Sequence, residues 1–266
     1  MNRIEKKFSD LQKKKQKALV VFITAGDPNL AMTEALIPEM EKEGVDLIEI
    51  GVPFSDPLAD GPVIQASSQR ALSKGVTLEK ILNTVRRARQ RSESPIALMS
   101  YLNPINHYGL EKFAKDAKRA GVDGVIIPDL PPDEGREISE VFKKSGLDLV
   151  YLVAPTSTTA RQQMILKASR GFVYFVSITG VTGSGKTISK EVLGQVSALR
   201  KHSKRAVCVG FGVSTPEQAK EVAKYADGVI VGSSIVRALT ENPKLKAPQF
   251  VQKFIRPLRL AVQKGD

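Results

Sequence analysis

Two carboxylates, Glu49 and Asp60, stand close together in the sequence but in unlike surroundings. Glu49 is the one charged residue of the apolar segment 47–51. Asp60 lies in the segment 53–62, whose three prolines and two aspartates are typical of a surface loop with a restricted backbone. Two carboxylates in different environments suit acid/base catalysis combined with stabilisation of a developing cation. These residues are therefore the first candidates for catalysis.

The segment around Glu49 has the alternation of a β-strand. A period of two places Leu47 and Glu49 on one face and Ile48 and Ile50 on the other. If the isoleucines contact helices, Glu49 is on the opposite face and points into the mouth of a closed barrel, where burial raises the pKa of a carboxyl group toward values that suit proton transfer. Two structural roles stay open: a neighbour could satisfy Glu49, and Asp60 could cap the helix that follows it.

The elements that must position these groups alternate between strands and helices. Eight apolar, β-branched runs are separated by segments with helical periodicity, without a linker or a low-complexity break. Helices between successive strands require parallel pairing and cover both faces of the sheet. The predicted strands are Ala18–Thr24, Asp46–Gly51, Pro95–Tyr101, Gly124–Ile127, Leu147–Val153, Phe172–Ile178, Ala206–Gly210 and Gly228–Val231.

Eight such units in about 230 residues match the size of a closed (β/α)8 TIM barrel. We therefore predict an α/β fold, a single barrel domain over residues 1–266, with an extra N-terminal helix and additional helices. An open doubly wound sheet is the alternative. In a barrel, catalytic groups lie at the carboxyl ends of the strands, which is where the segment with Asp60 follows its strand.

Glycine-rich turns follow the last two predicted strands, at 210–212 and 232–234. Together with Gly183 they offer backbone N–H groups, and a helix N-terminus begins at Ser233, where barrels commonly bind phosphate. This predicts a phosphorylated substrate whose reacting end lies near Glu49. Close packing of the glycines is the alternative explanation.

The segment 180–187 matches the nucleotide-binding pattern G-x-x-x-x-G-K-[ST] and follows a predicted strand. In a P-loop fold this motif normally follows an early strand, whereas five strand–helix units precede it here. No apolar strand ending in a clear Mg²⁺-binding aspartate follows. Nucleotide binding is therefore kept as a competing hypothesis.

The chain of 266 residues has a net charge of +12, from 40 Lys and Arg against 28 Asp and Glu. Such a charge raises the local concentration of anionic ligands. The densest run, Lys13–Lys15 with Lys17, borders the predicted N-terminal helix. We interpret it as a solvated helix face, with an acidic partner surface or nucleic acid as alternatives, and expect no specific nucleic-acid partner.

One cysteine and two distant histidines give no metal-ligand spacing, so no metal is expected. The first residues lack the apolar region of a signal peptide, and no apolar run of 18 residues occurs. The sequence therefore predicts a cytoplasmic protein without a membrane partner.

Over most of its length the chain resembles the tryptophan synthase alpha chain family. The resemblance is carried by the motifs Phe22–Pro28, Glu49–Gln65, Tyr101–Pro104 with Tyr108–Gly109, Ile127–Pro131, Ala154–Thr156, Gly180–Gly183 and Gly210–Ser214.

The resemblance implies a lyase that cleaves indole-3-glycerol phosphate to indole and glyceraldehyde 3-phosphate by a retro-aldol reaction. It implies that Glu49 transfers the proton and that Asp60 accepts the indole N–H. It also places Thr182 on a loop that closes against Asp60. The implied neighbours of the indole ring are Phe22, Ile64, Tyr101, Ile126 and Tyr174, and the implied phosphate site is Gly183, Gly212, Gly232 and Ser233.

The same resemblance implies a tryptophan synthase beta chain as partner in an α2β2 heterotetramer. Pyridoxal phosphate would belong to that partner, and this chain would carry no cofactor. The residues that match the family's contact surface are Pro53, Asp56, Pro57, Asn103 and Pro131, which could also be simple turn formers. A chain that mainly activates the beta chain and has little lyase activity is the non-enzymatic alternative.

Overall fold

The computed structural model describes residues 2–176, 189–210 and 212–263. Its strands form one parallel sheet in the order β5-β4-β3-β2-β1-β9-β8-β7-β6. The strands are β1 Ala18–Thr24, β2 Leu47–Gly51, β3 Ile96–Met99, β4 Gly124–Ile126, β5 Asp148–Val150, β6 Leu152–Val153, β7 Phe172–Val176, β8 Ala206–Gly210 and β9 Gly228–Val231.

The two ends of this order, β5 and β6, are consecutive in the chain and are separated by Tyr151 alone. They are the two halves of the predicted fifth strand. Backbone bonds from Arg170 to Leu149 (2.9 Å) and from Tyr174 to Tyr151 (3.1 Å) join this strand to the β7 side. The circuit is therefore a barrel of eight strand positions, and the open doubly wound alternative is wrong.

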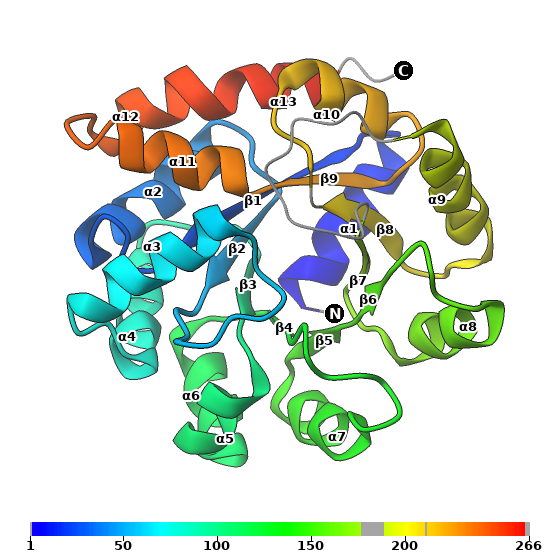
Figure 1. The fold of residues 1–266 in the computed structure, drawn as a ribbon, viewed down its shortest axis with the longest axis horizontal. Coiled ribbons are helices and arrows are strands. Elements are labelled where there is room, and N and C mark those ends of the chain that lie inside the picture. The colour runs from blue at the N-terminus through cyan, green and yellow to red at the C-terminus, as the bar shows by residue number, and fades with distance from the viewer. Residues whose placement is uncertain (1, 177–188, 211, 264–266) are drawn as a thin grey trace.

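Figure 1 shows the helices arranged in a ring around the strands, except for α1, which lies behind the centre of the ring. They are α1 Arg3–Lys13, α2 Leu30–Lys42, α3 Pro62–Ser73, α4 Leu78–Ala88, α5 Leu102–Tyr108, α6 Leu110–Ala120, α7 Arg136–Ser145, α8 Thr159–Ala168, α9 Lys190–His202, α10 Pro216–Ala223, α11 Ser233–Glu241, α12 Ala247–Phe250, the π-helical turn η1 Val251–Ile255 and α13 Arg256–Gln263.

Local sequence signals set several of these boundaries. Thr215 and Gln218 form a capping box at the start of α10. Gly121 and Gly146 end α6 and α7 in the left-handed conformation that glycine adopts without steric penalty. Helix α7 begins at Arg136, because a turn closed by bonds to the Pro131 carbonyl comes first.

The alternation predicted for β2 is confirmed. Leu47 lies in the inner cluster of the barrel, whereas Ile48 and Ile50 pack in the outer cluster between the sheet and the helices. Because side chains alternate along a strand, Glu49 shares the inner face with Leu47. The same rule places Phe22 of β1 and Ala97 of β3, its partners in the strand register, on the inner face beside it.

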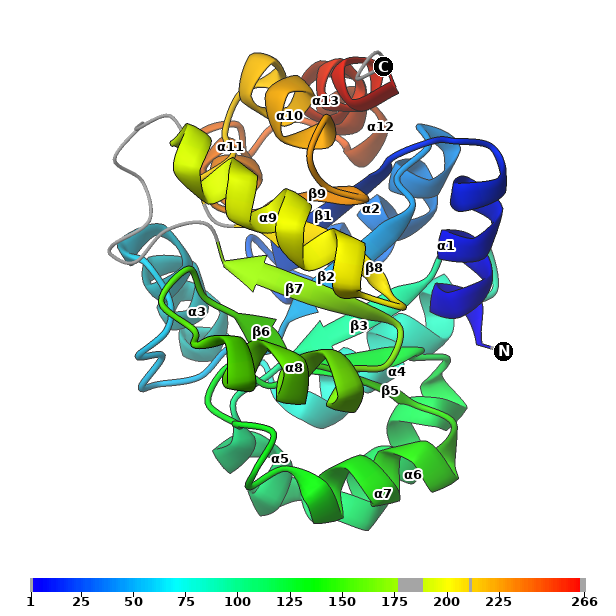
Figure 2. The same ribbon diagram turned by 90° about the vertical axis from the view of Figure 1, so that its right-hand side faces the viewer.

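Helix α1 covers the amino-terminal end of the barrel. Its buried residues Ile4, Phe8 and Leu11 belong to the inner cluster, and the Phe8 ring lies 5.7 Å from that of Phe172. In Figure 2 the arrowhead of β7 points away from α1, toward the end of the barrel where α3 lies. The carboxyl ends of the strands, where catalytic groups lie in a barrel, and the surfaces beside α1 are therefore at opposite ends of the molecule.

No helix in the described ranges is long and apolar enough to cross a membrane.

Candidate active site

Glu49 is completely buried in the centre of β2. Neither carboxylate oxygen has a hydrogen-bond partner among the described residues. Burial, reinforced by the nearby charge of Asp60, raises the pKa of Glu49 to about 8. The open alternative of a carboxylate satisfied by a neighbour is therefore not what the structure shows. At neutral pH this side chain is a protonated acid that can give up its proton.

Asp60 lies on the connection from β2 to α3 and is partly exposed. Burial raises its pKa to about 6, against the opposing effect of a hydrogen bond from the Tyr101 hydroxyl. The N-cap of α3 is Gly61, and no side chain caps that helix. The capping role considered for Asp60 is therefore not what the structure shows.

Tyr101 anchors the connection that carries Asp60. Its hydroxyl accepts a hydrogen bond from the Ala59 N–H at 2.9 Å, and its ring lies 5.3 Å from that of Phe54. On the other side, the Gln65 side-chain amide donates to the Asp60 carbonyl at 2.8 Å. The position of the Asp60 carboxylate thus depends on a residue that follows β3.

Because their pKa values differ, Glu49 and Asp60 are in different protonation states near neutral pH. Between about pH 6 and pH 8, Asp60 is mainly ionised while Glu49 is mainly protonated. A neutral acid beside an anion can protonate a substrate atom and stabilise the cation that results.

Replacing Tyr101 by Phe is expected to lower kcat/KM about five- to tenfold at pH 6 and little at pH 8, because loss of a hydrogen bond to an ionised carboxylate raises its pKa by roughly one unit. The measurement is kcat/KM, across pH, for the cleavage that the resemblance implies. Tyr108→Phe is the control, because it removes a Tyr hydroxyl that donates to Asp116 at 3.0 Å. An equal loss at every pH would show that Tyr101 acts only through packing.

The buried Glu49 also predicts a pH-dependent stability. Its pKa is near 4.5 in the unfolded chain and about 8 in the fold, so between these values the folded state holds a proton that the unfolded state has lost. Stability therefore falls as pH rises through this window. Glu49→Gln should be more stable than the natural chain by about 3–5 kcal/mol at pH 8 and equally stable at pH 4. Urea unfolding of both chains at the two pH values is the measurement, and an equal difference at both would contradict it.

Four of the predicted ring neighbours, Phe22, Ile64, Ile126 and Tyr174, belong to the inner cluster of the barrel. Two of them lie against glycine backbone. A Cβ on Gly51 would stand 2.4 Å from the Phe22 ring, and a Cβ on Gly210 would stand 2.4 Å from the Tyr174 hydroxyl oxygen. The structure thus brings an aromatic and aliphatic wall together beside Glu49.

The candidate phosphate residues lie at the ends of β8 and β9. Gly212 adopts φ +92°, and Gly232 is the N-cap of α11, where no side chain caps the first turn. Ser233 is the first helical residue. Ser234 lies in the predicted turn 232–234 but was not among the predicted site residues. Its buried hydroxyl has no hydrogen-bond partner among the described residues. The sequence signal for Ser234 is that a second serine follows Ser233 in the first turn of α11.

Thr182, Gly183 and the nucleotide-type motif 180–187 lie outside the described residues. Within the described ranges, no group of three His, Cys, Asp or Glu side chains could hold a metal ion. Cys208 is fully buried among the inner side chains, as expected for a core residue.

Comparison with known proteins agrees on one family. The family model "Tryptophan synthase alpha chain" matches residues 8–261. The tryptophan synthase alpha chain of Geobacter sulfurreducens is 51% identical over 262 residues, which cover 98% of this chain and 99% of the relative.

Solved structures show the same. The tryptophan synthase subunit alpha from Legionella pneumophila superposes with a TM-score of 0.91 at 40% identity, covering 98% of each chain. A chain of Mycobacterium tuberculosis tryptophan synthase superposes with a TM-score of 0.88 at 37% identity, also covering 98% of each. The matches span nearly the full length, and the chain therefore belongs to the tryptophan synthase alpha chain family.

Proposed function

We propose that Glu49 and Asp60 carry out the reaction of this family in this chain. The family consists of lyases of tryptophan biosynthesis that cleave indole-3-glycerol phosphate to indole and glyceraldehyde 3-phosphate. The observation that carries the proposal is that Glu49 is fully buried on the inner face of the barrel, without a hydrogen-bond partner among the described residues, near the charge of Asp60. This burial raises the pKa of Glu49 to about 8, whereas that of Asp60 is about 6. The neutral acid and the anion that the retro-aldol reaction needs are then present together at neutral pH.

In the proposed reaction, Glu49 donates its proton to C3 of the indole ring. The ring becomes a cation whose charge lies on nitrogen, and the Asp60 carboxylate accepts the N–H and stabilises that charge. Glu49, now ionised, removes the proton of the glycerol hydroxyl next to the breaking bond. The bond between C3 and the glycerol carbon then breaks, its electrons restore the aromatic ring, and the aldehyde leaves with Glu49 protonated again.

The remaining site residues are proposed to hold the two ends of the substrate. Phe22, Ile64 and Tyr174 offer an apolar surface for the ring, beside Glu49. The backbone N–H groups at the start of α11, with the unpartnered hydroxyl of Ser234, offer donors for the phosphate. Ile126 and Tyr101 also border the ring, and Thr182 is a further proposed substrate-binding residue. The proposed phosphate site consists of Gly183, Gly212, Gly232 and Ser233.

A pH profile tests this proposal. We expect kcat/KM for indole release to be bell-shaped, with an acidic limb near pH 6 from Asp60 and an alkaline limb near pH 8 from Glu49. Activity that continues to rise above pH 9 would exclude Glu49 as the acid. Absence of indole release, with or without a beta chain, would exclude the function itself.

The alpha chain family works with a beta chain, on which pyridoxal phosphate resides, and has no cofactor of its own. We propose that this chain forms an α2β2 heterotetramer through the connection 53–61 together with Asn103 and Pro131. Leu58 supports this surface, because it is a large apolar side chain that is 96% exposed. The mass of the mixed chains by sedimentation would test the stoichiometry.

The alternative of a non-enzymatic activator is disfavoured by Glu49. An unpartnered buried carboxyl group destabilises the fold at neutral pH, and a chain without lyase activity would have no use for it. The cytoplasmic location and the single domain over residues 1–266 stay predictions.

A further inference from the structure

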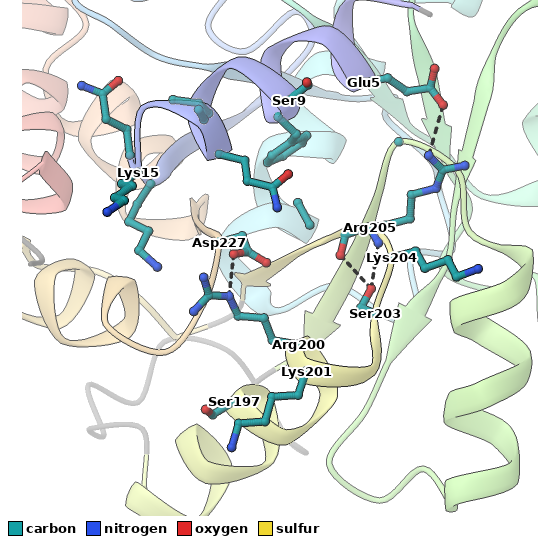
Figure 3. A pocket seen from close by; sticks show the side chains of 17 residues that line it. Glu5, Ser9, Lys15, Ser197, Arg200, Lys201, Ser203, Lys204, Arg205 and Asp227 are labelled. Carbon is teal, nitrogen blue, oxygen red and sulfur yellow. Dashed lines mark hydrogen bonds and ion pairs between the residues drawn. The ribbon is translucent and has the colours of Figure 1, made fainter.

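A cleft of about 740 Å³ lies at the amino-terminal end of the barrel, away from Glu49. It runs between α1 on one side and the end of α9 with the start of β8 on the other (Figure 3). Lys17, Gly171 and Ala206, which stand at the beginnings of three strands, line it. Sites for small molecules commonly have volumes of roughly 300–1,000 Å³. The cleft is therefore large enough for a ligand of its own.

The charge of the cleft is strongly positive. Two carboxylates line it, and both are already paired: Glu5 with Arg205 at 3.4 Å and Asp227 with Arg200 at 2.6 Å. Six cations face these two carboxylates, which leaves an excess of four positive charges. The six are Lys15, Lys17, Arg200, Lys201, Lys204 and Arg205.

Three of these cations are available to a ligand. Lys15, Lys201 and Lys204 are exposed and form no ion pair within the part of the chain that the structure describes. Lys15 also adopts φ +54°, the left-handed region that glycine usually occupies after a helix. The backbone conformation disfavours a lysine at this position. The presence of Lys15 at the edge of the cleft is therefore better explained by its charge.

Helix ends do not account for this charge. Both α1 and α9 end beside the cleft, and cations near a helix C-terminus are favourable because that end carries a partial negative charge of about 0.5. Two helices together offset roughly one of the four excess charges. About three remain, which is the charge of a compact polyanion.

We propose that this cleft binds a small oligophosphate with three to four negative charges. Lysine ammonium groups are common phosphate ligands. Lys15 follows the end of α1, and Lys201 and Lys204 lie across the cleft from it (Figure 3). The hydroxyls of Ser9 and Ser197 add uncharged donors along the cleft. An oligophosphate carries enough charge in this volume to balance the excess. The site lies apart from the carboxylate pair and does not depend on the proposed reaction.

The test is calorimetric titration of the full chain with inorganic tripolyphosphate. We expect saturable binding with one site, weakened about tenfold by Lys201→Gln with Lys204→Gln, which removes two exposed charge contacts. Lys143→Gln with Lys144→Gln is the control for net charge, because it removes two exposed lysines from another helix, α7, where Lys143 pairs with Glu140 at 3.8 Å. It should change the affinity less than twofold.

A second variant, Lys15→Gly, keeps the left-handed backbone and removes the side chain together with its charge, and should weaken binding about threefold. Melting temperatures without ligand show whether each variant folds. ATP in a parallel titration distinguishes a nucleotide from an inorganic phosphate chain, and binding of either supports the proposal.

Several results would overturn the site. Absence of saturable binding would do so, as would equal weakening by the α7 control, which would indicate attraction by net charge alone. If the Lys201/Lys204 variant bound tripolyphosphate as well as the natural chain does, the ligand would occupy the candidate phosphate residues after β8 and β9 and not this cleft. Tighter binding of a short DNA duplex than of tripolyphosphate would make the surface a nucleic-acid site instead.

Discussion

Glu49→Gln is expected to lower the turnover number for indole release by about 10²–10⁴-fold, the range for loss of a general acid/base. Glutamine has the shape of the protonated carboxyl group and fits the same position in β2. It cannot supply a proton to the indole ring or accept one from the glycerol hydroxyl. Because the substrate still meets the same surface, KM should change little.

Steady-state kinetics with saturating substrate measure this loss. Glu111→Gln is the control, because it makes the same change of charge on an exposed residue of α6, and it should keep full activity. Retention of more than about a tenth of the natural turnover by Glu49→Gln would remove Glu49 from the proton transfer, since such catalysis supplies at least ~10²-fold.

The barrel was predictable because its strands have simple patterns. Near-continuous apolar runs separated by helices leave few arrangements other than parallel strands covered on both faces. The interruption of the fifth strand was not predictable in this way. At Tyr151 the backbone N–H donates to the hydroxyl of Ser169 at 3.3 Å, so the ladder breaks where a side chain replaces a backbone acceptor.

The orientation of Glu49 followed from alternation alone, since its inner position is fixed by the outer positions of Ile48 and Ile50. The environment of Asp60 did not follow from sequence. It depends on Tyr101, whose hydroxyl accepts a hydrogen bond from the N–H of Ala59, 42 positions earlier in the chain. Tyr101 was expected only as a neighbour of the ring, and the structure shows that its hydroxyl also holds the connection.

The basic run near the N-terminus is a second case in which contacts between distant parts of the chain could not be predicted from the sequence. The sequence predicted a solvated helix face for Lys13–Lys15 with Lys17, and the structure divides that run. Lys15 and Lys17 line the cleft, whereas Lys13 and Lys14 do not. The opposite wall comes from residues 200–205, which only the packing of α1 across the barrel end brings near.

Asp60→Asn is the second large effect that we expect, a loss of about 10²–10³ in kcat, as for removal of a group that stabilises charge in a transition state. Asparagine retains the size of the side chain and can accept the indole N–H through its amide oxygen. It has no negative charge to balance the cation that forms on the ring. The loss should therefore appear in kcat more than in KM.

The pH profile of Asp60→Asn separates this role from simple positioning. The charge of Asp60 helps to raise the pKa of Glu49, so its removal should lower that pKa and move the alkaline limb to below about pH 8. The acidic limb near pH 6 should disappear with the group that causes it. Asp10→Asn on α1 makes the same change at the far end of the barrel and should leave both limbs in place. An Asp60→Asn variant whose two limbs stay where they were would show that Asp60 neither titrates in the reaction nor acts on Glu49.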